Sequence, residues 1–301
     1  MPYRLLCYIV IAALPLGISC GPPQPSSGDD GNGGAGGRCQ LAKEERDSNG
    51  DGSYSATTTY SYDGNRTSLT MTNADGEVTG SMVFTKDGSG KIMVSSSFNP
   101  EGEMVRRTTW ERDSNGEPLV VETDENGDGT VDSRTEYTRD EAGNAISTET
   151  DNDADGVVDR RITATFNGNG DMLSKETATG DEPASRETWT YEYDNSGNIL
   201  IKNRDRNDDG EIDNKSTYTY DDDNNRLTDV TVFYREGEEW MRNIYTYTYD
   251  SNGNLLSQEI GDPVTMRVVW TYDDNNNRLS EEYEDEAGAV TSRNVWTWSC
   301  R

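Results

Sequence analysis

A short sequence pattern recurs along most of this chain and limits the folds that the chain can adopt. The clearest copies are WTYEYDNSGNIL (189–200), YTYTYDSNGNLL (245–256) and WTYDDNNNRL (270–279). Successive turn-opening residues lie 23 to 29 residues apart. A period of this length is typical of a repeat protein in which each unit is one small structural element. The turn-opening residues are Asp63, Asp87, Asp113, Asp140, Asn167, Asp194, Asp221, Asp250 and Asp273.

Hydrophobic residues keep fixed positions around each turn. An aromatic residue lies three residues before the turn-opening residue in eight of the nine copies, with Ala164 as the exception, and an aliphatic residue lies five or six residues after it in all nine. Runs such as YTYTYD alternate aromatic residues with threonine, which is the period of a half-buried strand. The turns consist of Asp, Asn, Ser and Gly.

These features predict an all-β fold. Each unit supplies two antiparallel strands, so about 18 or 19 strands form tandem hairpins in one long meander. We expect the meander to curl into a spiral, shell or flattened barrel, because curling hides the apolar face and removes exposed edges. Tyr, Trp and Leu are expected on one face of the sheet, and Thr, Ser, Glu and Lys on the other.

The repeat resembles the YD repeat of the RHS family, whose unit is approximately Tyr-x-Tyr-Asp-x-x-Gly-Asn-x-Leu. The resemblance covers residues 54–298 and is most specific in the last four units. It implies a β-sheet spiral or hollow shell. Some family members enclose a toxin carried at their C-terminus, but this sequence stops one strand after its last repeat. We therefore do not expect the delivery role of the large members here.

The charge of the chain restricts its partners. Lys and Arg number 27 against 57 Asp and Glu, which gives a net charge of -30. Nucleic acid and anionic membrane surfaces both require a basic patch, so neither is expected as a partner. Low hydrophobicity with high net charge would normally indicate disorder. The 16 tyrosines and 6 tryptophans, many at regular spacing, favour a folded chain instead.

The first 38 residues predict export and anchoring. Arg4 precedes an apolar run over 5–18, which is too short to span a membrane and is typical of a secretory signal. The segment LGISC, which ends at Cys20, resembles the lipobox of bacterial lipoproteins, with Gly17 as a departure. We expect a lipoprotein signal peptide over 1–19, lipid on Cys20, a flexible Gly/Pro/Ser tether over 20–38 and the repeat domain over 39–301. An ordinary cleaved signal is the alternative. The expected location is the outer membrane or cell surface of a bacterium, where the lipid anchor is the contact with the membrane.

Two cysteines remain after signal cleavage and lipidation of Cys20, and they lie at the two ends of the repeat domain. In an oxidising compartment Cys39 and Cys300 are expected to pair as a disulfide. A flat meander of this length would hold them roughly 80 Å apart, whereas a disulfide requires Cα atoms within ~7 Å. The bond therefore requires a curled sheet, and an intermolecular bridge or two free thiols are the alternatives.

Acidic loops form a second recurring motif. DENGDGTVD (124–132), DNDADGVVD (151–159) and DRNDDGEID (205–213) share the pattern D-x-[DN]-x-D-G-x-x-D, and DSNGDGSYS (47–55) is a poorer copy. The motif resembles the front of an EF-hand loop, in which alternate oxygens converge on Ca²⁺. It departs at position 12, where Thr135, Ile162 and Ser216 replace glutamate. Weak calcium sites are expected, and plain β-turns are the alternative. The candidate ligands are Asp124, Asn126, Asp128, Thr130, Asp132, Asp151, Asp153, Asp155, Asp159, Asp205, Asn207, Asp209, Glu211 and Asp213.

Nothing in the sequence indicates catalysis. The chain has no histidine, so histidine-based triads and histidine metal ligands are excluded. Carboxylates are so frequent that no pair stands out as the acid and base of a glycosidase. We expect no enzyme but a surface-anchored structural or binding protein with calcium-binding loops and an extracellular glycan or protein ligand. The alternative is a carbohydrate-binding or carboxylate-based glycan-active surface protein, in which the aromatic face holds sugar.

Overall fold

The structure is a computed structural model that describes residues 39–300. These residues form twenty strands and no helix. Accordingly, the described residues contain no helix long and apolar enough to cross a membrane. The strands are β1 (Cys39–Asp47), β2 (Ala56–Asp63), β3 (Arg66–Asn73), β4 (Val78–Lys86), β5 (Ile92–Phe98), β6 (Met104–Arg112), β7 (Pro118–Asp124), β8 (Ser133–Arg139), β9 (Ala145–Asp151), β10 (Arg160–Phe166), β11 (Met172–Thr179), β12 (Ser185–Tyr193), β13 (Ile199–Asp205), β14 (Asn214–Tyr220), β15 (Arg226–Arg235), β16 (Glu238–Tyr249), β17 (Leu255–Ile260), β18 (Met266–Tyr272), β19 (Arg278–Asp285) and β20 (Val290–Cys300).

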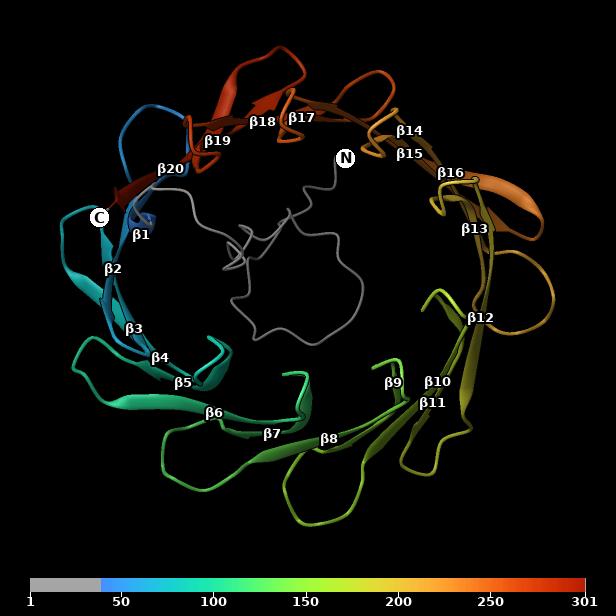
Figure 1. The fold of residues 1–301 in the computed structure, drawn as a ribbon, viewed down its shortest axis with the longest axis horizontal. Coiled ribbons are helices and arrows are strands. Elements are labelled where there is room, and N and C mark those ends of the chain that lie inside the picture. Colours follow the sequence, from blue (N-terminus) through green and yellow to red (C-terminus); the bar gives the residue numbers. More distant parts are fainter. Residues whose placement is uncertain (1–38, 301) are drawn as a thin grey trace, which may run out of the picture. The chain divides into compact units, whose positions relative to one another are not determined.

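The strands form one closed antiparallel meander. Each strand pairs with the next along the chain, and β20 returns to pair with β1, so the sheet closes into a barrel (Figure 1). The predicted all-β meander and its curling are confirmed. The predicted number of strands was too low, because β1 was not anticipated. Its sequence, CQLAKEERD, lacks the aromatic alternation of the repeats, yet it lies between β2 and β20 and completes the ring.

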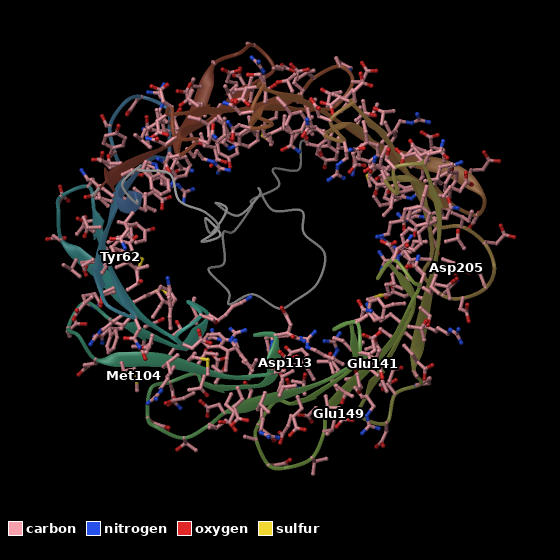
Figure 2. The ribbon with its side chains drawn as sticks, viewed as in Figure 1. Tyr62, Met104, Asp113, Glu141, Glu149 and Asp205 are labelled. Carbon is pink, nitrogen blue, oxygen red and sulfur yellow. The ribbon has the colours of Figure 1, made fainter. Side chains whose placement is uncertain are left out.

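Connections between strands alternate between the two ends of the barrel. We call the end with the tight turns of the repeats the turn rim, and it includes the connection from β2 to β3 and every second connection after it. The other end, which includes the connection from β1 to β2 and every second one after it, is the loop rim. In the view down the ring, Asp113 and Glu141 of the turn rim lie toward the inner margin, whereas Met104 and Asp205, near the loop rim, lie toward the outer margin (Figure 2).

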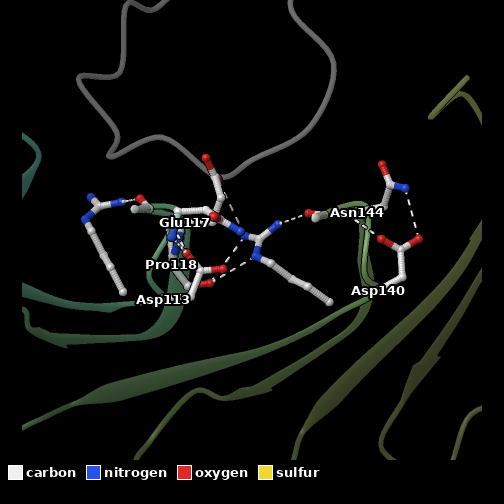
Figure 3. A network of polar contacts seen from close by, with 10 residues as sticks. Asp113, Glu117, Pro118, Asp140 and Asn144 are labelled. Atoms are coloured by element: carbon white, nitrogen blue, oxygen red, sulfur yellow. Dashed lines mark hydrogen bonds and ion pairs between the residues drawn. The ribbon is translucent and has the colours of Figure 1, made fainter.

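In the tight turns after the one from Asp63, the side chain of the turn-opening residue holds the turn together. In the turn from Asp194, the Asp194 Oδ1 atom accepts bonds from the N–H groups of Ser196 (2.9 Å) and Asn198 (2.8 Å), and Asn198 Nδ2 donates to Asp194 Oδ2 (2.9 Å). Gly197 takes the left-handed backbone that the turn requires (φ 87°). The Asp-x-x-Gly-Asn part of the repeat is therefore a self-contained turn. Figure 3 shows two such turns, which open at Asp113 and Asp140.

In five repeats the residue directly before the turn donates a side-chain hydrogen bond to a backbone carbonyl of the previous repeat. Tyr220, Tyr249 and Tyr272 donate their hydroxyls to the carbonyls of Ile199 (2.9 Å), Arg226 (3.0 Å) and Leu255 (2.9 Å). Each accepting carbonyl belongs to the first residue of the strand that follows the previous turn. Arg112 and Arg139 occupy the same position and donate to Ile92 and Pro118 in the same way. This inter-repeat bond explains why the repeat has a tyrosine directly before its aspartate.

The leucine of the repeat does not lie where the alternation predicts. In the last unit Tyr272 pairs with Arg278, but Thr271 pairs with Ser280, so Leu279 is an extra residue without a cross-strand partner. Such a β-bulge breaks the alternation of faces. The expected burial of this leucine is therefore wrong in six of the nine units, where the side chain is about two-fifths exposed. The exposed leucines are Leu119, Leu173, Leu200, Leu227, Leu256 and Leu279.

Aromatic side chains and arginines interleave along one face of the sheet. The Arg226 guanidinium lies over the rings of Tyr218 (5.3 Å) and Tyr247 (5.7 Å), so it joins β14 to β16. Arg278 similarly lies over Trp270 (5.9 Å) and Trp296 (5.4 Å). Few apolar side chains are fully buried in this single layer, and Trp270 is 3% exposed. Lateral stacking and strand pairing therefore stabilise the barrel in place of a thick core.

Candidate calcium-binding loops

Four acidic loops lie on the loop rim, where they follow β1, β7, β9 and β13. Three are the predicted motifs at 124–132, 151–159 and 205–213. We number the positions of each loop from its first aspartate. All four loops close with the same backbone bond, in which the N–H of position 9 donates to the carbonyl of the residue before position 1. The shared sequence pattern therefore gives one shared loop structure.

The first aspartate of each loop organises the backbone around its carboxylate. Asp124 is only 6% exposed, and it accepts bonds from the N–H groups of Asn126 (3.3 Å), Gly127 (2.6 Å) and Gly129 (2.8 Å). Asp151 and Asp205 make the matching bond to the glycine at position 6, at 2.8 Å in each loop. These N–H donors fix the direction of the carboxylate.

The remaining predicted aspartates each use one carboxylate oxygen for the backbone. At position 5, Asp128, Asp155 and Asp209 accept the N–H of position 7 at 2.8 Å, namely that of Thr130, Val157 and Glu211. At position 9, Asp132, Asp159 and Asp213 accept the N–H of position 2 at 2.7 Å. At position 3, Asn126, Asp153 and Asn207 accept the N–H of position 5. In each of the three predicted loops, backbone N–H groups thus fix side-chain oxygens at positions 1, 3, 5 and 9.

The loop at 151–159 brings three carboxylates together. Oxygens of Asp151, Asp153 and Asp159 lie within 4.8 Å of one another, and this is the one such group of three acidic residues in the described part of the chain. The nearby Asp155 carboxylate raises the pKa of Asp153 above its ordinary value through like-charge repulsion. For Asp151, burial raises the pKa, but the N–H groups of Gly156 and its neighbours outweigh burial and leave the pKa below its ordinary value. Asp153 is therefore the carboxylate of this loop that a cation would relieve most.

The other two predicted loops have asparagine at position 3, so they offer fewer carboxylates to an ion. At position 12, none of the loops supplies a carboxylate. Thr135 and Ser216 lie on strands and their hydroxyls contact Thr150 (3.3 Å) and Thr231 (2.7 Å), which lie on neighbouring strands. The twelfth position therefore belongs to the sheet.

The sequence analysis ranked the loop at 47–55 as a poorer copy of the motif, but its structure matches that of the other loops. Asp47 is 2% exposed and accepts bonds from the N–H groups of Asn49, Gly50 and Gly52, as Asp124 does in its own loop. Ser55 replaces the last aspartate and bonds instead to Ser48, with 2.7 Å between the two hydroxyl oxygens. The signal that could have found this loop is its DSNGDG segment, which matches DENGDG of the second loop at every position except position 2.

The donor set of these loops suits a hard cation. All available side-chain ligands are oxygens of Asp, Asn, Ser, Thr or Glu, and the chain has no histidine. Calcium takes six to eight such oxygens in flexible geometry. The three carboxylate oxygens of the loop at 151–159 lie close enough to share one ion. Residues present in the loops therefore fit calcium, with the fullest carboxylate set at 151–159.

The predicted lipid and disulfide positions lie at the margin of the structure or outside it. Cys20, the signal segment 1–19 and the tether 20–38 fall outside the described residues. The backbone register of β1 and β20 places Cys39 directly opposite Cys300. The two ends of the repeat domain are thus neighbours, which the disulfide requires.

Comparison with known proteins gives only distant likeness. No protein-family model and no curated protein sequence matches the chain. Crystalline TcdB2-TccC3 has 13% identity and a TM-score of 0.34, and the match covers 80% of this chain and 16% of that one. The Photorhabdus luminescens Tc holotoxin pore has 14% sequence identity and a TM-score of 0.33, and the match covers 80% of this chain and 16% of that one. A porin-like protein from Bacteroides uniformis has 14% identity and a TM-score of 0.33, and the match covers 86% of this chain and 98% of that one. TM-scores of this size do not assign the chain to a family.

Proposed function

We propose that this chain is a surface-anchored extracellular lipoprotein with a structural and binding role, in which a YD-type repeat barrel is stabilised by calcium at its loop rim. The observation that carries the proposal is the set of like-folded acidic loops, one of which brings three carboxylates within 4.8 Å of one another. The lipobox-like segment at Cys20 and the resemblance to RHS repeats support export and display. We propose no catalytic activity, which agrees with the absence of histidine.

Calcium would act on the stability of the barrel through charge. The net charge of -30 disfavours the compact state, because clustered carboxylates repel one another. An ion bound only to the folded loops stabilises the fold by mass action. At a calcium concentration about tenfold above Kd, each site contributes about 1.4 kcal/mol. Extracellular calcium modules have Kd values of about 0.1 to 1 mM, so millimolar calcium is the relevant range.

A thermal melt tests the calcium sites. The melting temperature should rise by several degrees in millimolar calcium and fall again with chelator. The triple variant Asp128→Ala, Asp155→Ala, Asp209→Ala should lose most of this rise, because it removes position 5 from three loops. The matched control is Asp75→Ala, Asp222→Ala, Asp274→Ala, which removes the same charge from other connections and should keep the rise. Equal melts with and without calcium would leave only the turn role for these loops.

The anchor is tested separately by metabolic labelling with a fatty acid. The wild-type chain should incorporate label and partition into detergent, and Cys20→Ala should do neither. Equal labelling of both chains would exclude Cys20 as the lipidated residue. A barrel that responds to calcium but takes no lipid would keep the loop sites and remove the surface anchor from the proposal.

A further inference from the structure

The hairpin of β15 and β16 extends past its neighbour on one side. β16 pairs with β15 over Glu238–Thr246, but it pairs with β17 only over Tyr245–Tyr249. The bond from the Gly261 N–H to the Ile244 carbonyl (2.9 Å) marks the last contact on that side. In the part of the chain that the structure describes, residues 238–243 therefore have a strand neighbour on the β15 side only.

The backbone at this edge offers unpaired hydrogen-bonding groups. Backbone N–H and C=O groups point to alternate sides along a strand, and the Ile244 carbonyl points toward β17. The N–H and C=O of Arg242, two residues earlier, therefore point to the same side, beyond the end of β17. An unpaired strand edge of this kind is a template for an added strand.

A large apolar side chain lies beside the open edge. Trp240 is 54% exposed, and the next residue, Met241, is 37% exposed. Two neighbours contact the Trp240 ring. Its centroid lies 6.3 Å from that of the Phe233 ring, and the Arg235 guanidinium lies 5.0 Å from the Trp240 centroid. An ordered and exposed tryptophan is a frequent anchor of protein interfaces.

The charge around this edge selects the partner. Glu236, Glu238 and Glu239 are exposed on the hairpin. Arg235 and Arg242 lie on the same hairpin, and Arg242 is paired with Glu239 (2.8 Å), so the hairpin has a net charge of -1 on a chain whose net charge is -30. A second copy of this chain would bring like charges together, and anionic lipids or nucleic acid would be repelled. A cationic partner complements the surface.

We propose that the free edge of β16 at 238–243 binds an extended cationic peptide segment of another protein, which adds one strand to the barrel. Backbone groups around Arg242 would pair with the peptide, Trp240 would contact an apolar side chain of it, and the glutamates would attract its lysines or arginines. This site is distinct from the calcium loops and does not depend on them.

The test uses the full mature chain and synthetic peptide probes of about ten residues that alternate lysine with valine or threonine. Fluorescence anisotropy of the labelled peptide gives Kd. We expect binding at physiological salt, and a loss of at least about tenfold when alternate peptide nitrogens are methylated, because the methylated strand cannot donate to the edge. Trp240→Ala should weaken binding to a similar degree. Val78→Ala, at an exposed apolar residue of the loop rim outside the acidic loops, is the matched control and should bind as the wild type does.

Two further variants separate backbone from side chain. Arg242→Pro removes the N–H at the open edge and should weaken binding, whereas Arg242→Ala keeps this N–H and should bind at least as well as the wild type. Equal binding of the methylated peptide, or unchanged binding by Trp240→Ala, would reduce the interaction to charge attraction and overturn the proposal. A dimer in sedimentation that Arg242→Pro abolishes would make a second copy the occupant and would also overturn it.

Discussion

At position 4 of the acidic loops the backbone is left-handed in all four copies, but the side chain differs. Gly50 and Gly127 have φ values of 71° and 76°, and Ala154 and Asp208 have 55° and 57°. A Cβ atom added to Gly127 would overlap the Met104 carbonyl oxygen, and one added to Gly50 would overlap that of Val290. Glycine at these two positions is therefore required by a close neighbour as well as by φ.

This difference predicts opposite outcomes for two mirror substitutions. Gly127→Ala should lower the free energy of unfolding by at least about 2 kcal/mol, because the backbone must move and adopt a strained φ. Ala154→Gly should be neutral or stabilising by about 0.5 kcal/mol, since relief of left-handed strain slightly exceeds the gain in unfolded-state entropy. Denaturant unfolding measures both. Similar losses in the two variants would contradict the assigned contact with Met104.

At the scale of the element, hairpins and tight turns could be predicted because two local signals coincide. Alternating aromatics define strands, and Asp-x-x-Gly-Asn defines the turn between them. The bulge at Leu279 could not be predicted, because it depends on how Thr271 and Ser280 align across strands. β1 was missed for a related reason, since its place in the sheet depends on β20, which lies at the other end of the repeat domain.

In the acidic loops, too, local features could be predicted from the sequence and the rest could not. Three were predicted because the motif is local and its position 9 keeps an aspartate. The loop at 47–55 was undervalued because Ser55 breaks the motif, although Asp47 accepts the same backbone bonds as Asp124 does in its loop. The convergence of Asp151, Asp153 and Asp159 depends on side-chain directions that the spacing suggests but does not determine.

The inter-repeat bonds are a property of neighbouring elements and can be tested by removing one hydroxyl. Tyr272→Phe should lower the free energy of unfolding by about 1 kcal/mol, because the Leu255 carbonyl loses its donor while the ring is retained. Tyr249→Phe should behave similarly through Arg226. Tyr54→Phe, on the exposed surface of the loop rim, is the control and should change stability by less than about 0.5 kcal/mol. Equal effects at all three positions would refute the role of the bond.

At the scale of the whole molecule, closure depends on the summed curvature of twenty strands. No single repeat encodes this curvature, so the sequence predicted curling without choosing between a spiral, a shell and a barrel. Inter-repeat bonds recur at several turns of the ring and also occur at its closure, where Tyr62 donates to the Leu41 carbonyl of β1 (2.8 Å) and Trp298 of β20 donates to that of Arg278 (2.7 Å). The ring is therefore joined at the closure by bonds of the same kind as elsewhere.

The register of β1 with β20 predicts a disulfide between Cys39 and Cys300 in the exported protein. Closing so long a loop should stabilise the fold by about 5 kcal/mol in the chain-entropy model, and by less if the unfolded chain is compact. Peptide mapping of the monomer without reductant should yield one linked peptide, and Cys39→Ser should melt at a lower temperature. Free thiols in the exported protein, or a bridge between two chains, would exclude the intramolecular bond.

Pairing of β1 with β20 also restricts how the number of repeats can change in evolution, compared with an open solenoid. An open array grows in length when a unit is duplicated, and its terminal units must be capped against solvent. In this ring a duplicated unit must widen the circumference, and every inter-strand angle must adjust at once. The number of units therefore cannot change without altering the whole ring. A change in it would alter the diameter of the ring, while its height stays that of one strand.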